Sequence, residues 1–522
     1  MTNCQVKTIS KQNVDIILEK SNKSIDFLDY KIVIKYLLLF TFLLFAGNYF
    51  KDFVGITISF FVLLFVLTGN LYKSIELYLI WLFSYGFYLG QGYLTIEVLS
   101  KYVVKPSFLL FIIFSLSFTK IPAELKKTKF IFVWILFLLI TILSAIFHKQ
   151  SVLVIITLSS FYILYLILSA RLFTVYQYKK ILNIFIATAI MQTIVSFLQI
   201  SQMISPSTTI LDDGSGGKYE WAAGLDDVAS GTFGPVSSHI VSWYAAIIAL
   251  LSILIWTITK KKKYIVVACL TFIQFAMVDS KIIMGVTILM MLYLLYFLNR
   301  HRRVFQLNIH RLIFLIIIVC GIGFGLFKGW DHYYKYISDS GGDKSMRGLQ
   351  NVYEKQILSS QKTLFEYLPQ WGKIQGFRSV FEDFMESDLL GIIWGYGIQG
   401  FSYNEKGNYI LNKDTPIMRI NNFTNSRSSL IDQFAQSGLI GFTLFFISIL
   451  FWYKYNIIIE KFDRISMINN CLLKFGTFFT FLAAFLYSIS ITSIVVIAFA
   501  GVIASLKNYS TINKNPNNQK FI

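Results

Sequence analysis

The chain has 522 residues, of which 55% are hydrophobic, 17% aromatic and only 14% charged, and its formal net charge is +19. The low charged fraction excludes an ordinary soluble domain, where about a quarter of the residues are charged, and the apolar content excludes a disordered chain. The basic charge would suit a nucleic-acid-binding protein, but membrane proteins also retain Lys and Arg in their cytoplasmic loops. The position of the charges therefore decides what they mean.

The first 31 residues are polar and charged, and no apolar stretch precedes a small-residue cleavage site. We therefore expect no cleaved signal peptide and a cytoplasmic N-terminal segment over 1–31. After it come apolar runs that are each long enough to cross about 30 Å of hydrocarbon. We predict roughly fourteen spans, within a range of 12–14, so the expected fold is an all-α polytopic integral membrane protein. The predicted spans are 32–48, 53–70, 76–96, 103–119, 130–148, 151–170, 181–200, 236–257, 264–279, 281–298, 311–327, 430–453, 470–487 and 489–506.

Lysine and arginine concentrate in alternate gaps between these spans. The positive-inside rule then predicts that both termini are cytoplasmic. On this topology the basic excess is cytoplasmic and needs no nucleic-acid partner. The clearest basic gaps hold Lys126, Lys127 and Lys129, then Lys179 and Lys180, then Lys260, Lys261, Lys262 and Lys263, and then Arg300, Arg302, Arg303 and Arg311.

Two outward segments are much longer than the other connections. One covers 201–235 within a first membrane bundle at 32–327, and the other is a large extracytoplasmic loop at 328–428. Loops of this length are usually functional. Apolar residues at helical spacing predict short helices at 349–368 and 376–390 in the large loop, the second ending at a glycine-rich run from Gly391. About three spans at 429–506 and a cytoplasmic tail at 507–522 complete the organisation.

No phosphate-binding loop, zinc-protease motif or nucleophile elbow occurs in the chain. None of the five histidines pairs closely with one of the four cysteines, so we predict no metal site. The outward face instead holds four cations near the predicted membrane level: Lys281, Arg378, Arg419 and Arg427. Arginine binds phosphate oxygens through two parallel hydrogen bonds. The alternative is that each is an ordinary surface or snorkelling charge.

Four short stretches, in order along the chain, resemble the O-antigen polymerase and ligase family. The stretch from Gly231 to Pro235, Gly-Thr-Phe-Gly-Pro, is similar to a turn that precedes a span in that family. Ser280-Lys281 stands where the family often shows Ser-Arg. Arg378 followed by Gly395-Tyr-Gly-Ile-Gln-Gly-Phe resembles the outer-loop arginine and glycine run, and Arg427 to Gly441 resembles the segment that leads into the next span.

Three positions depart from the family pattern. Arg427 replaces the histidine that the ligases are thought to use, which favours a polymerase. The arginine usually found just before the turn at Gly231 is absent. Lys281 keeps the charge but lacks the forked guanidinium.

The resemblance implies a metal-independent membrane glycosyltransferase that needs no cofactor. It would transfer a growing polysaccharide from one undecaprenyl-pyrophosphate carrier to a new lipid-linked repeat unit, making O-antigen or capsule on the outer face of the membrane. Arg427 and Arg378, with Lys281 and Arg419, would bind the pyrophosphate. Its partners would be the donor and acceptor glycolipids, membrane lipid and a chain-length regulator protein.

A general base for the acceptor hydroxyl is expected to be a carboxylate or a histidine within hydrogen-bond reach. Glu382, Asp383, Asp432 and His239 are the catalytic candidates, and their residue types do not rank them. Three of them have a plainer alternative, because Glu382 can pair with Arg378 on a helix surface, Asp432 can cap a span and His239 can be a packing residue. Substrate-binding candidates in the large loop are Trp394, Gly395, Tyr396 and Gly397, although its aromatic residues could equally form an interfacial belt.

Two other functions fit the same composition. One is an O-antigen ligase, which would join finished polymer to an acceptor. The other is a transporter or flippase for the lipid-linked oligosaccharide. Against a flippase, the predicted spans show no paired Gly/Pro breaks and few ionisable residues at their centres.

Overall fold

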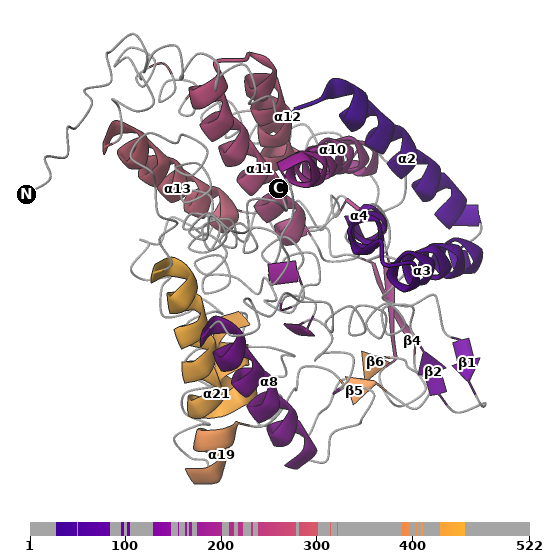
Figure 1. Cartoon of the computed structure of the whole chain (residues 1–522), viewed down its shortest axis with the longest axis vertical. Helices are drawn as coiled ribbons and strands as arrows, with labels where there is room; N and C mark the ends of the chain where they lie inside the picture. Colours follow the sequence, from indigo (N-terminus) through magenta and orange to yellow (C-terminus); the bar gives the residue numbers. More distant parts are fainter. Residues whose placement is uncertain are drawn as a thin grey trace, which may run out of the picture.

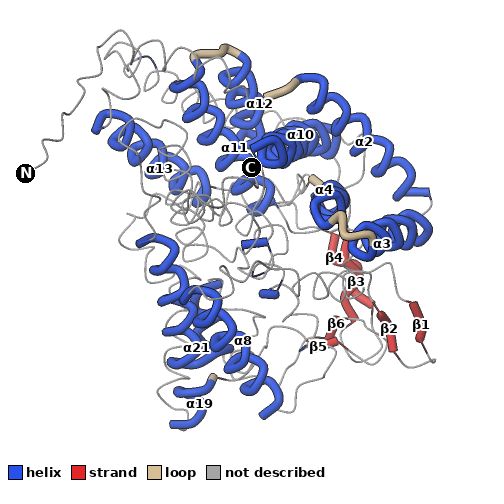
Figure 2. The backbone as a smooth tube through the Cα atoms, viewed as in Figure 1, coloured by secondary structure: helices blue, strands red, loops and turns tan. Residues whose placement is uncertain are grey.

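The computed structural model shows a predominantly helical protein with a few short strands (Figures 1 and 2). The residues it describes are 28–49, 51–83, 96–98, 102–104, 129–147, 155, 162–163, 166, 168–169, 175–200, 208–212, 218–222, 231–232, 238–277, 281–300, 314, 321, 389–395, 402–403, 409–410 and 429–454.

Apart from α19, the helices of the described part lie on predicted spans, most of them within three residues of the predicted bounds. α10 begins six residues before the predicted start at 181, and α4 begins five residues before the predicted start at 76 and ends at Trp81, well short of the predicted end at 96. The helices are α2 (Tyr30–Tyr49), α3 (Lys51–Leu67), α4 (Leu71–Trp81), α8 (Lys129–Phe147), α10 (Val175–Ile200), α11 (Ser238–Thr259), α12 (Lys263–Met277), α13 (Lys281–Arg300), α19 (Leu389–Trp394) and α21 (Ser429–Lys454). The prediction of a helical fold is therefore confirmed for these residues.

Two segments, Tyr176–Gln199 in α10 and Ile240–Thr257 in α11, are long and apolar enough to cross a membrane by length and composition. The predicted spans at 470–487 and 489–506, nearly all of those at 103–119, 151–170 and 311–327, and the predicted loop helix at 349–368 lie outside the described residues. Of the predicted helix at 376–390, only its end is described, and there the expected boundary is wrong. Gly391 lies inside α19 instead of following a helix.

The turns between helices use residues suited to their backbone geometry. Gly69, with φ of 78°, ends α3, and the next residue, Asn70, accepts a hydrogen bond from the Lys73 amide at 3.3 Å as the N-cap of α4. At the start of α2, Asp29 Oδ1 accepts from the Lys31 amide at 3.1 Å in the same way. The turn between α11 and α12 is an exception, because Lys260 adopts a φ of 57°, a left-handed conformation that residues other than glycine rarely adopt.

One apolar core joins α2, α3, α4, α10, α11, α12 and α13. Its largest fully buried side chains include Trp81 of α4 and Trp243 and Tyr244 of α11, and α11 lies at its centre because nearly all of its described side chains are buried. α8, α19 and α21 pack on one another as a second group of helices (Figure 1).

Two small sheets were not predicted from the sequence. β1 (Ile96–Val98) and β2 (Tyr102–Val104) pair antiparallel. The predicted end at 96 of one span and the predicted start at 103 of the next are therefore wrong, because the backbone is extended there instead of helical. The second sheet has the strand order β4-β3-β6-β5. Its strands are β3 (Thr208–Asp212), β4 (Lys218–Ala222), β5 (Ser402–Tyr403) and β6 (Tyr409–Ile410). It lies below α3 and α4 in the view of Figure 2.

The second sheet connects the two long segments that the sequence predicts on the outer face. β3 and β4 belong to the segment at 201–235, whereas β5 and β6 belong to the large loop at 328–428. The link is the parallel pairing of Asp212 with Ile410. These two segments therefore meet in one sheet, although about 200 residues separate them along the chain.

Candidate functional site

Two glycines from segments far apart in the sequence cross in direct backbone contact. Gly395 follows α19 with φ of 76°, and Gly438 interrupts α21 with φ of 61° and ψ of −171°. A Cβ atom on Gly395 would stand 2.5 Å from the carbonyl oxygen of Gln436, and one on Gly438 would stand 2.5 Å from the carbonyl oxygen of Ile393. Only glycine fits at either position, both in backbone conformation and in space.

Buried hydrogen bonds hold this crossing in place. Ser144 of α8 donates its hydroxyl to the Gly395 carbonyl at 3.2 Å. Tyr162 donates its hydroxyl to Oε1 of Gln433 at 2.6 Å, and Ser437 donates to the Gln433 backbone carbonyl at 2.7 Å. The side chains of Ser144, Tyr162, Gln433 and Ser437 are each no more than 2% exposed. The start of α21 is thereby fixed against α8 and α19 at a site that excludes water.

An aromatic cluster lies beside these hydrogen bonds. The cluster comprises Trp134 and Phe137 of α8, Phe445 of α21, and Tyr162. The ring centroids of its contacting pairs lie 5.2 to 6.1 Å apart. Trp134 also donates its indole N–H to the Tyr162 carbonyl at 3.1 Å. Tyr162 therefore contributes both its ring and its hydroxyl to joining α8 and α21.

The turn at Gly231 and Thr232 is held by two glutamines of α10. The Gly231 amide donates to Oε1 of Gln199 at 2.8 Å, and Gln199 Nε2 donates to the Gly231 carbonyl at 3.1 Å. The Thr232 amide donates to Oε1 of Gln192 at 2.8 Å, and Gln192 Nε2 donates to the Thr232 hydroxyl at 2.6 Å. Each amide side chain thus satisfies both a donor and an acceptor of one turn residue.

This turn lies at the opposite end of α10 from the predicted cytoplasmic lysines. Gln199 and Lys179 are about 30 Å apart along the helix axis at the usual rise per residue. Further buried polar groups occur near Gln199, since Gln274 of α12 donates to the Ser196 hydroxyl at 2.6 Å. Polar side chains are therefore concentrated inside the bundle near this end of α10.

Three of the predicted site residues lie at helix starts. His239 is the second residue of α11, Lys281 is the first residue of α13, and Asp432 is in the first turn of α21. Their backbones lie where helix dipoles favour negatively charged ligands. Trp394 is 39% exposed at the end of α19, next to the buried Gly395.

The other predicted site residues lie outside the described part of the chain. These are Arg378, Glu382, Asp383, Tyr396, Gly397, Arg419 and Arg427. Along the sequence Arg427 stands two residues before α21 begins, and Tyr396 directly follows Gly395. Their roles, and the substrate-binding role of Gly395, stay predictions.

The sequence reasoning missed the residues that hold these segments together. Gln433 lies within the stretch that resembles the family, but nothing in the stretch distinguishes it from its neighbours. Gln192 and Gln199 could have been identified from the sequence, because amide side chains seven residues apart on an apolar span lie on one helix face and need buried hydrogen-bond partners. Within the described residues, no group of three or more His, Cys, Asp or Glu side chains could hold a metal ion.

Comparisons with protein families, with curated proteins and with solved structures found no match to the chain.

Proposed function

We propose that the chain polymerises undecaprenyl-pyrophosphate-linked oligosaccharide repeat units into a surface polysaccharide on the outer face of the plasma membrane. The observation that carries this proposal is the backbone contact between Gly395 and Gly438. It joins two of the stretches that resemble O-antigen polymerases, and in the sequence Gly395 follows the candidate Arg378 and Gly438 follows the candidate Arg427. The contact supports a shared site because residues that act on one substrate must lie close together.

The proposed chemistry is a glycosyl transfer. A hydroxyl oxygen of the acceptor sugar attacks the anomeric carbon of the donor glycan and forms the new glycosidic bond. The bond from that carbon to the pyrophosphate oxygen breaks, and undecaprenyl pyrophosphate leaves with the electron pair. The hydroxyl proton goes to a general base, for which Glu382, Asp383, Asp432 and His239 are the candidates.

The arginines have a defined role in this scheme. Negative charge grows on the departing pyrophosphate in the transition state, so cations positioned there lower the barrier more than they tighten substrate binding. We assign this role to Arg427 and Arg378, with support from Lys281 and Arg419. Lys281 begins α13, where the helix N-terminus adds to the positive potential.

A membrane location is supported by the surface of the helices as well as by their length. On α8, the side chains of Phe132, Leu143 and Phe147 are 54% to 73% exposed. Large apolar side chains in such positions are typical of surfaces that face lipid. The full topology, with about 14 spans and both termini cytoplasmic, belongs to the same proposal.

Deletion of the gene separates this function from its two alternatives. A polymerase mutant accumulates single lipid-linked repeat units on the outer leaflet. A ligase mutant instead keeps full-length polymer on its lipid carrier, and a flippase mutant traps the repeat unit on the cytoplasmic leaflet. The length and the leaflet of the lipid-linked glycan are both measured, and any result other than outer single units contradicts the proposal.

A further inference from the structure

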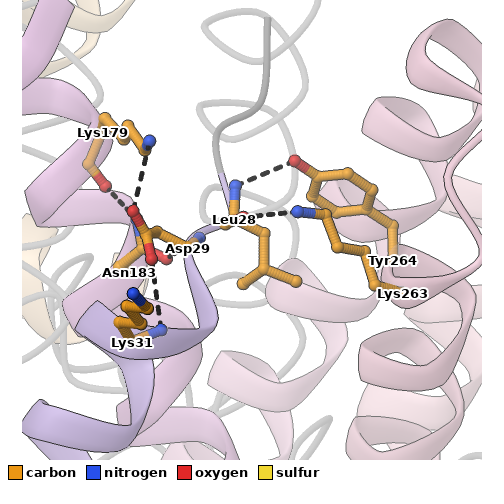
Figure 3. Close-up of polar contacts among 7 residues, drawn as sticks. All are labelled: Leu28, Asp29, Lys31, Lys179, Asn183, Lys263 and Tyr264. Atoms are coloured by element: carbon orange, nitrogen blue, oxygen red, sulfur yellow. Dashed lines mark hydrogen bonds and ion pairs between the residues drawn. The ribbon is translucent and has the colours of Figure 1, made fainter.

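The chain segment that leads into α2 is clamped between α10 and α12. On the α10 side, Oδ2 of Asp29 lies 3.5 Å from Nζ of Lys179, and the Asp29 amide donates to Oδ1 of Asn183 at 3.0 Å (Figure 3). On the α12 side, the Leu28 amide donates to the Tyr264 hydroxyl at 2.9 Å.

The same clamp brings the lysine turn at 260–263 to the start of α2. Lys263 donates from Nζ to the Leu28 carbonyl at 2.5 Å, and this ammonium also lies 5.2 Å from the ring centroid of Tyr30 (Figure 3 shows the hydrogen bond). We call the N-terminal part of α2 together with this turn the basic end; it comprises Lys31, Lys35 and the lysines at 260–263.

The acidic side chains described near the basic end are already paired. Asp29 is paired with Lys179, and Glu76 accepts a hydrogen bond from Tyr36 at 2.6 Å and lies 3.9 Å from Lys180. The basic end therefore keeps an excess of positive charge that these carboxylates do not neutralise.

Lysines of the basic end are accessible. Lys31, Lys35 and Lys262 are exposed, and among the described residues none of the three forms an ion pair. Their ammonium groups are available to an anionic ligand.

An exposed apolar stripe continues from these lysines along α2. Ile34, Leu38 and Phe42 recur every four residues and are 55%, 67% and 64% exposed. Lys35 precedes Leu38 by three residues and Phe42 by seven, so these three side chains share one helix face. The face thus presents a cation at one end and a continuous apolar surface beyond it.

From this juxtaposition we propose that the N-terminal half of α2 binds an anionic phospholipid. Its headgroup phosphate lies against Lys31, Lys35 and Lys262, and an acyl chain lies along Leu38 and Phe42. A soluble phosphate would use the lysines alone, whereas a zwitterionic lipid would gain little from them. The combination of excess charge and an adjoining apolar stripe therefore selects a phospholipid with a net negative headgroup.

The proposal rests on the membrane location in the proposed function and not on glycan polymerisation. The test uses the full chain purified in a mild detergent. Dissociation constants are measured by native mass spectrometry for phosphatidylglycerol and phosphatidylcholine, and glycerol 3-phosphate serves as the headgroup without chains.

We expect phosphatidylglycerol to bind at least tenfold more tightly than either of the other two probes. Lys35→Gln weakens its binding roughly fivefold, the loss that one lysine beside an anionic lipid is expected to cause. Leu38→Gln weakens lipid binding without changing the affinity for glycerol 3-phosphate. The matched control is Lys73→Gln on α4, which removes another exposed lysine, whose ammonium lies 5.7 Å from the centroid of the Phe65 ring.

Three results would overturn the proposal. Equal affinity for phosphatidylglycerol and phosphatidylcholine shows that charge does not select the lipid. Equal affinity for glycerol 3-phosphate and phosphatidylglycerol shows that the apolar stripe does not contribute to lipid binding. An equal loss in K35Q and K73Q shows an effect of net charge without a site, and far-UV circular dichroism of each variant verifies that it is folded. Glycan polymerisation can fail while lipid selectivity persists, so the two proposals are tested separately.

Discussion

A Cβ atom on Gly395 would stand 2.5 Å from the carbonyl oxygen of Gln436 and would collide with the amide nitrogen of Gly438, so the backbones of these two glycines pack directly against each other. Both glycines have positive φ angles. This contact fixes the end of α19 against α21, and in the sequence Gly438 follows Arg427 by eleven residues.

Gly395→Ala is expected to destabilise the protein. The substitution imposes a backbone conformation that alanine rarely adopts and a clash with backbone atoms that cannot move aside, at a cost of about 2 kcal/mol or more. The measurement is the thermal inactivation midpoint of the purified protein. Gly321→Ala is the control, because a Cβ there meets nothing within 4 Å. A G395A protein as stable as G321A would show that this crossing is absent in solution.

Tyr162→Phe is expected to lower stability by about 1–3 kcal/mol. It removes the hydroxyl that donates to Gln433 and leaves a buried amide oxygen without that donor. Adding Gln433→Leu removes the orphaned group, so the double variant should lose less than the sum of the two single losses. Strictly additive losses would argue against the hydrogen bond.

Gln199→Leu and Gln192→Leu are expected to release the turn at Gly231 and Thr232. Each substitution leaves a backbone amide of the turn without its buried acceptor, at a cost of about 1–3 kcal/mol. Under the proposed function, both variants insert into the membrane but make less long polysaccharide. The readouts are membrane abundance and the length of the surface glycan. If both variants make surface glycan of wild-type length, the turn does not contribute to the active site.

The proposed reaction is expected to proceed in a chelator. The donor is already activated by pyrophosphate, and we assign the neutralisation of that group to arginines, whose charge does not depend on a bound ion. Addition of EDTA should therefore leave the initial rate within about twofold, a change worth less than 0.5 kcal/mol. Abolition by EDTA and recovery with a divalent cation would assign the neutralising charge to a metal.

The helices could be predicted from the sequence because continuous apolar runs determine them locally. α2, α8 and α21 begin or end within two residues of their predicted spans. The small sheets could not be predicted in this way. β5 and β6 have two residues each, and their pairing with β3 depends on a contact far along the chain.

Of the candidate site, the sequence singles out the glycine run beginning at Gly395 and the segment leading to Gly438, but only as separate stretches. Their contact depends on tertiary packing that no local pattern encodes. Tyr162 was missed for the same reason, since its partner Gln433 is 271 residues away.

Reconstitution tests the central claim most directly. The purified protein is placed in liposomes with the lipid-linked repeat unit of its own organism, without metal or nucleotide sugar, and product length is read by gel electrophoresis. We expect a ladder of polymers from the wild-type protein and from Arg300→Ala, a control at the exposed end of α13, but none from Arg427→Ala. An unchanged repeat unit after incubation with the wild-type protein, or a normal ladder from Arg427→Ala, would contradict it.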